Sequence, residues 1–366
     1  MKFSVARSEF LDCLSVVNRG ISARSTLPIL SSVLMKTDGG SVVIQSTDLE
    51  VSVRKAMAAG VEKEGEAAVP SRILTDIIKS LPEAAVTFEQ KDEVNAEVRS
   101  GNSVFGVRLL NSQDFPAFPT VEKEKAVELP VSLLSDAVRQ VGRSASRDET
   151  RPVFTGILLQ IGGGEIKMVA TDSYRLALRR IELDEPIEDL EVIIPSRTAE
   201  EISRIAGAHE SVSLGVSQNQ VIIEAGDAAF VSRRIEGQFP DYRKLIPAES
   251  ETIVKVNREE FLEAAKRVAI FAQQNSPLRV KVDSDAQNLH LSAATPDLGG
   301  ADEDLMVEAE GEAIEIAFNA AFLIDGLAAA QSETVRMELT TPLKQGVLRS
   351  EDAEDFTYII MPVRLG

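Results

Sequence analysis

The residue types that most often do catalytic chemistry are scarce in this chain. Only two histidines occur, His209 and His290, and neither has a cysteine or a second histidine at metal-ligand spacing. The single cysteine, Cys13, lies beside Leu14 on the apolar side of an expected helix, so we expect it in the core. These observations predict no catalytic residue, no metal and no cofactor.

Two other patterns could carry chemistry. Gly162-Gly163-Gly164 does not match a P-loop and lies between two strand-like segments, where it predicts a hairpin turn. Asp302, Glu303 and Asp304 are dense enough to predict a solvated acidic loop. Carboxylates alone can support hydrolysis, so a hydrolase built on repeated α+β domains remains a weaker alternative.

The composition is that of a folded protein with more than one domain. The 366 residues suggest two or three domains, and 44% of them are hydrophobic while 27% are charged. No apolar run approaches the roughly 20 residues of a membrane span. The start of the chain lacks the apolar stretch of a signal peptide, and one cysteine excludes an intramolecular disulfide. We therefore expect a cytoplasmic protein.

The formal charge of −19, considered for the chain as a whole, argues against nucleic-acid binding. Binding to DNA depends on the charge of one surface, so an acidic chain can still meet phosphates where its cations gather. The charge must therefore be examined segment by segment.

The chain repeats itself at a long spacing. Thr47-Asp48-Leu49 recurs as Thr171-Asp172-Ser173, and a looser copy follows as Thr295-Pro296-Asp297. Other matches at almost the same shift are Val69-Pro70-Ser71-Arg72 with Ile194-Pro195-Ser196-Arg197, Gly101–Phe105 with Gly226–Phe230, and Phe115-Pro116 with Phe239-Pro240. Common turn dipeptides would not share a register. We therefore predict three similar domains, at residues 1–120, 125–245 and 252–366, with polar linkers at 117–128 and 246–253.

Each repeat has the same order of expected elements. A short strand precedes an amphipathic helix at 8–20, 131–144 and 258–271, where apolar residues recur at helical spacing. Strands follow, and a second helix starts near a proline-serine signal at 71–81 and 196–206, or near Asn319 at 319–330. We expect Asn257 and these serines to act as N-caps. The pattern predicts an α+β fold in which each domain packs two helices on an antiparallel sheet.

A collinear set of motifs resembles one family. The set comprises Thr26-Leu27-Pro28-Ile29-Leu30, Thr47-Asp48-Leu49-Glu50, Glu149–Gly156, Ala170–Leu176, Phe239-Pro240-Asp241-Tyr242 and Tyr358–Leu365. Over its whole length the chain is similar to the bacterial sliding clamps, the beta subunits of DNA polymerase III. No single motif carries this resemblance; their shared order does.

The resemblance implies the DNA-clamp fold and a head-to-tail homodimeric ring with helices around the hole. Six helices packed about 10 Å apart leave a bore of only about 10 Å, whereas twelve leave a bore of about 30 Å. Only the dimer could therefore enclose a duplex. The implied partners are double-stranded DNA without sequence preference, the replicative polymerase, the clamp loader and other proteins with clamp-binding motifs, and the implied function is processivity in DNA replication.

The expected helices are less acidic than the rest of the chain. The segments 7–20, 71–81, 130–147, 196–206, 257–273 and 319–330 together carry +2, which leaves −21 elsewhere. Such a lining suits a ring that slides, because strong phosphate neutralisation would hold it in place. The expected phosphate contacts are Arg24, Arg72, Arg143, Arg147 and Arg197. Ordinary solvated helix faces would explain the same balance.

The resemblance also implies a client-peptide site between the second and third domains. Its residues are Phe154, Thr171, Ser173, Tyr174, Arg175, Leu176, Pro240, Lys244, Leu245, Ile359, Ile360, Met361, Pro362, Val363, Arg364 and Leu365. The apolar members would form a cleft, and the cations would meet acidic or carbonyl groups of the peptide. An alternative places Ile360 and Met361 in the core of an ordinary final strand.

Ring closure would bring Val107 of one chain near Ile270 and Phe271 of the other. A protein-interaction scaffold that never touches DNA remains the main alternative function. Retention on closed circular DNA distinguishes a ring from such a scaffold.

Overall fold

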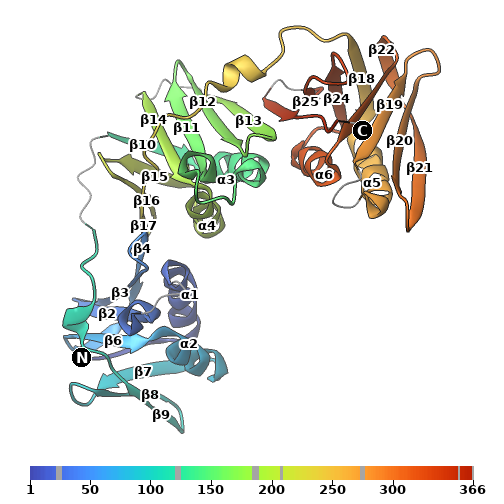
Figure 1. Ribbon diagram of the computed structural model, residues 1–366. Coiled ribbons are helices and arrows are strands. Elements are labelled where there is room, and N and C mark those ends of the chain that lie inside the picture. The colour runs from blue at the N-terminus through green and yellow to red at the C-terminus, as the bar shows by residue number, and fades with distance from the viewer. Residues whose placement is uncertain are drawn as a thin grey trace. The chain divides into compact units, whose positions relative to one another are not determined.

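The structure is a computed structural model that describes residues 1–21, 27–119, 125–183, 189–206, 209–272, 277–352 and 355–364. The chain divides into two compact units, Met1–Ser132 with Glu201–Arg234 and Leu133–Glu200 with Ile235–Gly366. A strand, a helix, several strands, a second helix and three closing strands follow one another three times along the chain (Figure 1). This order confirms the α+β fold with three similar repeats.

The elements of the three repeats have the following bounds. The first contains β1 (Lys2–Ala6), α1 (Arg7–Val17), β2 (Ser32–Asp38), β3 (Ser41–Thr47), β4 (Val51–Ala58), β5 (Gly60–Lys63), β6 (Glu66–Pro70), α2 (Ser71–Ser80), β7 (Ala85–Gln90), β8 (Asn95–Ser100) and β9 (Ser103–Arg108). The second contains β10 (Lys125–Pro130), α3 (Val131–Val141), β11 (Gly156–Gly162), β12 (Glu165–Thr171), β13 (Arg175–Glu182), β14 (Leu190–Pro195), α4 (Ser196–Ala206), β15 (Ser211–Val216), β16 (Gln220–Ala225) and β17 (Ala228–Arg233). The third contains β18 (Thr252–Asn257), α5 (Arg258–Val268), β19 (Leu278–Asp283), β20 (Asn288–Thr295), β21 (Gly299–Met306), β22 (Glu308–Gly311), β23 (Ile314–Phe318), α6 (Ala320–Ala329), β24 (Thr334–Leu339), β25 (Gly346–Ser350) and β26 (Phe356–Ile360).

In the first unit, strands of two repeats form one sheet. Its order is β10-β15-β16-β17-β4-β3-β2-β6, and β4 joins the repeats by antiparallel pairing with β17, where Val53 lies opposite Phe230. The other sheet of this unit has the order β5-β1-β7-β8-β9, so β9 is an edge strand.

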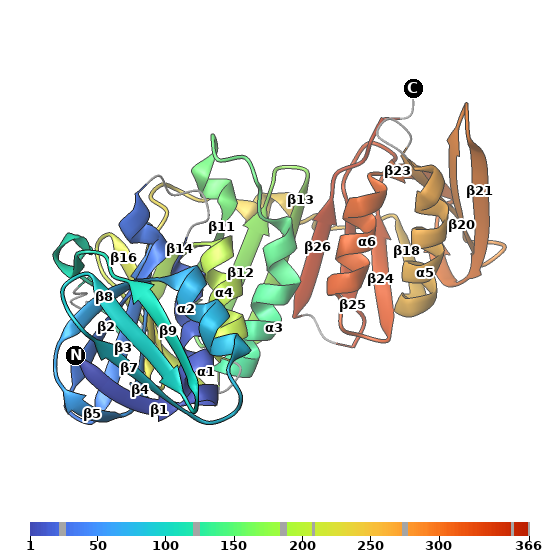
Figure 2. The same ribbon diagram turned by 90° about the horizontal axis from the view of Figure 1, so that it is seen from below.

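The second unit joins repeats in the same way. Its larger sheet has the order β14-β11-β12-β13-β26-β25-β24-β18-β22, and β13 pairs with β26, where Leu176 lies opposite Ile359. A smaller sheet, β21-β20-β19-β23, leaves β21 at its edge. Helices α5 and α6 pack against each other beside these strands (Figure 2). Strands about 180 residues apart in the sequence therefore become neighbours at the β13–β26 seam.

The first helix of each repeat ends in a tighter turn than we predicted. α1, α3 and α5 stop at valines and continue as the 3₁₀ turns η1 (Asn18–Gly20), η4 (Gly142–Ser144) and η7 (Ala269–Phe271). Each turn closes with a short-range backbone bond, such as Ile21 N to Asn18 O at 3.2 Å and Ala272 N to Ala269 O at 3.0 Å. Such bonds satisfy carbonyls that a helix terminus leaves free.

The capping prediction is confirmed for one residue and wrong for another. The Asn257 side chain accepts hydrogen bonds from Glu259 N at 3.0 Å and Glu260 N at 3.1 Å. Ser71 instead is the first residue of α2, where its hydroxyl donates to the Asn18 side chain and the cap position is Pro70. Tertiary contact with the end of the first helix therefore replaced local capping.

Two turn predictions also differ in outcome. Gly163 and Gly164 have φ of 63° and 80° between β11 and β12, which confirms the hairpin. The acidic run at 302–304 is wrong as a loop, because it lies in the edge strand β21. The three carboxylates therefore lie at an open sheet edge, where charge discourages unwanted strand pairing. The predicted linkers are also shorter, since β10 begins at Lys125 and β18 at Thr252.

Cys13 is in the core of the first repeat, as predicted. It is fully buried on α1, and burial raises the pKa of its thiol to about 12. At pH 8 about one such thiol in ten thousand is ionised, and only the thiolate is alkylated efficiently. We expect iodoacetamide at pH 8 to label the native protein at least about 100-fold more slowly than the protein unfolded in urea. Equal rates, measured by mass spectrometry, would contradict this burial.

Within the described part of the chain, no helix is long and apolar enough to cross a membrane. The same residues contain no cluster of three or more His, Cys, Asp or Glu side chains that could hold a metal ion. His290 lies on β20 with Nδ1 3.0 Å from Asp304 Oδ1, and His209 precedes β15.

Candidate binding surfaces

A tight loop between β12 and β13 forms the first part of the candidate client-peptide site. Asp172 Oδ1 accepts hydrogen bonds from Tyr174 N at 2.9 Å and Arg175 N at 3.0 Å. Thr171 Oγ1 accepts from Ser173 N at 3.1 Å, and Ser173 has a φ of 81°. These bonds hold a backbone conformation that is uncommon for a residue other than glycine.

The end of the chain forms the second part. Met361 N donates to Tyr174 O at 2.9 Å, and Val363 N donates to Ala317 O at 2.8 Å. Tyr174, Met361 and Val363 expose 61%, 41% and 39% of their surface. The hydrogen bond of Met361 therefore joins the last residues to the loop, and both segments present exposed side chains with apolar surface. Leu365, another predicted member, lies outside the described residues.

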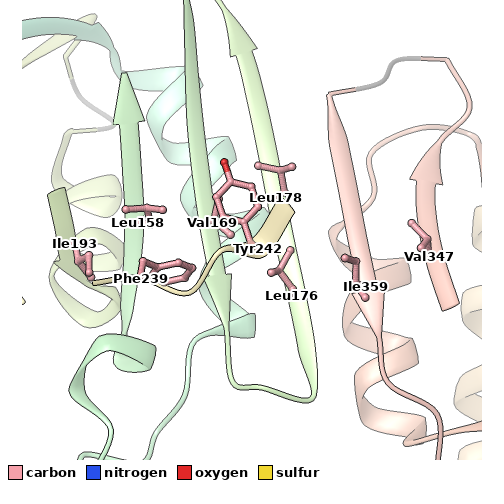
Figure 3. Close-up of a cluster of buried hydrophobic side chains, with 9 residues drawn as sticks. All are labelled: Leu158, Val169, Leu176, Leu178, Ile193, Phe239, Tyr242, Val347 and Ile359. Atoms are coloured by element: carbon pink, nitrogen blue, oxygen red, sulfur yellow. The ribbon is translucent and has the colours of Figure 1, made fainter. Parts of the chain in front are cut away.

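A buried apolar cluster spans the seam between β13 and β26 (Figure 3). Its residues are Leu158, Val169, Leu176, Leu178, Ile193, Phe239, Tyr242, Val347 and Ile359. Only Leu176 and Ile359 of these were predicted. The others could have been found from alternation along strands, since Leu158 and Leu178 both lie opposite Val169 and Leu178 is two residues from Leu176.

The remaining predicted site residues divide by exposure. Pro240, Lys244 and Leu245 are exposed in the segment that follows Phe239, and Pro362 and Arg364 are accessible at the end of the chain. Thr171 and Ile360 are buried. Successive strand residues face opposite sides, so Ile360 points away from the cluster that holds Ile359. The core alternative is therefore right for Ile360, while Met361 is partly exposed.

Phe154 is not part of the apolar cluster, although we expected it in the apolar cleft of this site. Val153 packs on the apolar cluster, whereas the Phe154 ring lies 5.0 Å from the guanidinium carbon of Arg151. Arg151 also donates to Asp148 Oδ2 at 3.1 Å and to Ser173 Oγ at 3.0 Å. Arg151 therefore ties this short turn to the loop, a contact that sequence patterns gave no sign of.

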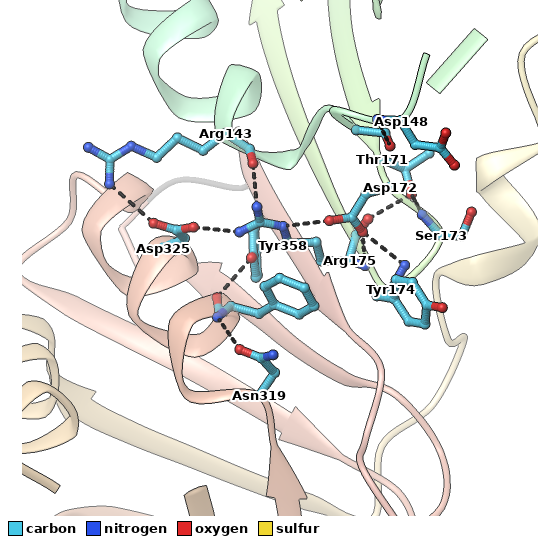
Figure 4. A network of polar contacts seen from close by, with 12 residues as sticks. Arg143, Asp148, Thr171, Asp172, Ser173, Tyr174, Arg175, Asn319, Asp325 and Tyr358 are labelled. Carbon is cyan, nitrogen blue, oxygen red and sulfur yellow. Dashed lines mark hydrogen bonds and ion pairs between the residues drawn. The ribbon is translucent and has the colours of Figure 1, made fainter. Parts of the chain in front are cut away.

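Arg175 does not have the surroundings of a residue that meets a peptide. Its side chain is only 11% exposed, and its donors are directed to groups of the chain itself (Figure 4). Beside it, burial raises the pKa of the Tyr358 hydroxyl, which donates to Phe322 O at 2.8 Å. Lys244 and Arg364, the other two cations predicted for this site, are exposed.

Three of the arginines predicted to contact DNA meet in one place. A cavity of about 950 Å³ in the second unit is lined by Arg143, Arg147 and Arg197, together with Arg151 and Arg175. Carboxylates from Glu149, Asp172, Glu200 and Asp325 share it. Arg197 lies in the first turn of α4, where the helix dipole also favours an anion. The arrangement can bind phosphate weakly, because the cations exceed the carboxylates by only one.

The other two arginines are not part of this cavity. Arg72 is exposed on α2 in the first unit. Arg24 lies outside the described residues. Among the residues that the structure describes, Arg72, Arg147 and Arg197 make no ion pair, which leaves their charges available.

The predicted interface residues also differ from one another. Ile270 is 67% exposed and Phe271 is partly exposed at the end of the first helix of the third repeat. Val107 is only 5% exposed, so it packs inside its own repeat and is wrong as a surface contact. Val104, on the same edge strand β9, is 53% exposed.

Comparison with known proteins gives a consistent result over the whole chain. Sequence models of the N-terminal, central and C-terminal domains of the DNA polymerase III beta subunit match residues 1–119, 128–241 and 243–364. The beta sliding clamp of Synechocystis sp. is 33% identical over all of both chains, and that of Staphylococcus epidermidis is 30% identical over all of this chain and 99% of the relative. The solved sliding clamp of Bacillus subtilis superimposes with a TM-score of 0.95 at 28% identity, covering all of both chains. The Pseudomonas aeruginosa clamp bound to griselimycin gives 0.94 at 29%, with the same coverage.

Proposed function

Because this chain belongs to the DNA polymerase III beta subunit family, the sliding clamps, we propose that it closes around duplex DNA and tethers the replicative polymerase and other clamp-binding proteins to it. The observation that carries this proposal is that the similarity extends through all three repeats without a missing part. Its role is topological, and it needs no catalytic residue. We propose the cytoplasm as its location, since bacterial chromosomal DNA lies there.

A ring requires two chains, and the edge strands support a head-to-tail dimer. β9 in the first repeat and β21 in the third are both open edges. β9 carries exposed Arg108, whereas β21 carries Asp302 and Asp304. Unpaired edges pair readily with strands of another chain, and opposite charges favour this pair over two identical edges. We propose that β9 of one chain meets β21 of the other, with Val104 in place of the predicted Val107 near Ile270 and Phe271. The proposed domains remain 1–120, 125–245 and 252–366.

Retention on circular DNA tests the proposed function. The protein is loaded onto nicked circular duplex by a clamp loader and separated from free protein by gel filtration. We expect it to stay on the circle and to leave within minutes after a restriction enzyme linearises the DNA. Equal retention on linear DNA would indicate ordinary binding. No retention on the circle, with client peptides still bound, would support the scaffold alternative.

The arginine cavity predicts the salt dependence of DNA binding. Replacing Arg143, Arg147 and Arg197 together by alanine is expected to make the negative slope of log K against log salt shallower by about three, because each phosphate contact releases close to one counterion. The measurement is equilibrium binding to duplex DNA between 50 and 200 mM salt. Over this range a few phosphate contacts change the affinity by roughly tenfold.

A matched triple variant controls for net charge. Lys36 on β2, Arg99 on β8 and Arg279 on β19 lie on strands and not on the helices that would surround the hole. Replacing these three residues by alanine should therefore leave the slope unchanged. An unchanged slope after the cavity substitutions would remove these arginines from the DNA contact.

A further inference from the structure

The Arg175 side chain joins three segments of the second unit. Nε donates to Asp172 Oδ2 at 3.0 Å, Nη1 to Asp325 Oδ2 at 2.6 Å, and Nη2 to the carbonyl oxygen of Arg143 at 2.5 Å (Figure 4). The guanidinium carbon also lies 4.4 Å from the centre of the Phe322 ring. Asp325 and Phe322 belong to α6 in the third repeat, while Asp172 belongs to the loop of the second.

The backbone of the same residue holds the loop. Arg175 N donates to Asp172 Oδ1 at 3.0 Å, and Arg175 O accepts from Thr171 Oγ1 at 2.6 Å. The adjacent Tyr174 O accepts the hydrogen bond of Met361 N. Arg175 therefore joins the loop to α6, and its neighbour Tyr174 joins the loop to the last residues of the chain.

We infer that Arg175 and Asp325 form a clasp that positions residues 171–175 and Met361 for client-peptide binding without touching the peptide. This inference rests on the proposed function of that surface. The Arg175 side chain is nearly buried, with 11% of its surface exposed, and that of Asp325 is partly exposed, with 27%. A buried, forked guanidinium with three bonded partners orients the chain more sharply than a lysine could, because the ammonium group lacks the planar fork.

Asp325 also accepts a weaker contact from a residue of the arginine cavity. Arg143 Nη1 lies 3.3 Å from Asp325 Oδ1, and its side chain is 60% exposed. An exposed ion pair contributes little, so losing this contact should not disturb the clasp. Arg143→Ala therefore serves as a control that keeps the Arg175 contacts of Asp325.

Strand β13 supplies a second control. Arg179 lies four residues beyond Arg175 and forms an ion pair with Asp355 of the third repeat. Arg179→Lys perturbs another link between the same repeats, at a distance from the loop. It separates general loosening of the seam from loss of the clasp.

The experiment compares the full-length dimer with variants Arg175→Lys, Asp325→Asn, both together, Arg179→Lys and Arg143→Ala. The probe is a fluorescein-labelled peptide carrying a clamp-binding motif that ends in apolar residues, followed by anisotropy. We expect each clasp variant to weaken peptide binding about tenfold, the double variant to weaken it no further, and both controls to stay within about twofold.

Amide hydrogen exchange separates positioning from direct contact. In the free protein, the amides of Tyr174, Arg175 and Met361 are expected to exchange faster in both clasp variants than in the controls. If Arg175→Lys weakens binding while Asp325→Asn does not, and these amides keep their protection, Arg175 contacts the peptide and the inference is wrong. Equal affinities in all variants would also refute it. Absence of peptide binding to the unaltered protein would instead refute the proposed client site itself.

Discussion

Removing residues 361–366 is expected to abolish client-peptide binding while leaving the dimer and its retention on circular DNA intact. The deletion removes Met361 and Val363, whose partly exposed apolar side chains would each contribute on the order of 1.5–3 kcal/mol when a peptide covers them. It also removes the backbone bond from Met361 N to Tyr174 O that fixes the loop. The expected loss is at least about 100-fold in Kd, since every 1.4 kcal/mol is about tenfold.

A variant with an intact backbone sharpens this prediction. Met361→Ser with Val363→Ser retains both main-chain donors and should still weaken binding about 30-fold or more, because the apolar contact area is lost. Fluorescence anisotropy gives the affinity, and sedimentation gives the oligomeric state. Undiminished binding of client peptides to the truncated chain would show that the site lies elsewhere.

Charged substitutions at Ile270 and Phe271 are expected to convert the dimer into folded monomers. Ile270→Asp with Phe271→Asp would place two carboxylates in an interface whose neighbouring strand β21 is already acidic. A buried, unpaired charge costs several kcal/mol, so a shift of the dimer Kd by about 1,000-fold or more is expected. Light scattering at low micromolar concentration measures the mass, and circular dichroism confirms that the monomer is folded.

Two other variants test the geometry of this interface. Val104→Asp, on β9, should have a similar effect if that strand faces the partner. Val94→Asp is the matched control, because Val94 is 49% exposed between β7 and β8, outside the edge strand. A stable dimer with aspartates at 270 and 271 would count against closure through these residues.

The repeated architecture could be predicted from the amino-acid sequence alone. Helical periodicity and turn residues are local properties of the sequence, and here they recur in three copies at the same spacing. The helices, the Gly163-Gly164 hairpin and the burial of Cys13 could therefore be predicted from these patterns. The Asn257 cap was predictable for the same reason, since it satisfies amides only two and three residues away.

The composition of the candidate surfaces depends on contacts between residues far apart in the sequence. Residues 175–179 and 356–360 pair across 180 residues of sequence, and this seam, which no local pattern records, puts Ile359 into the apolar cluster and turns Ile360 away. Other long-range contacts bury Val107 in the first unit. In the second unit they gather three separate arginines in one cavity and direct Arg175 to Asp325. A side chain's type limits which partners it can take, but its free energy depends on which of them the fold brings within hydrogen-bond distance. Sequence therefore identified the residues of the candidate sites, whereas the fold decided which of them face a partner and which hold the others in place.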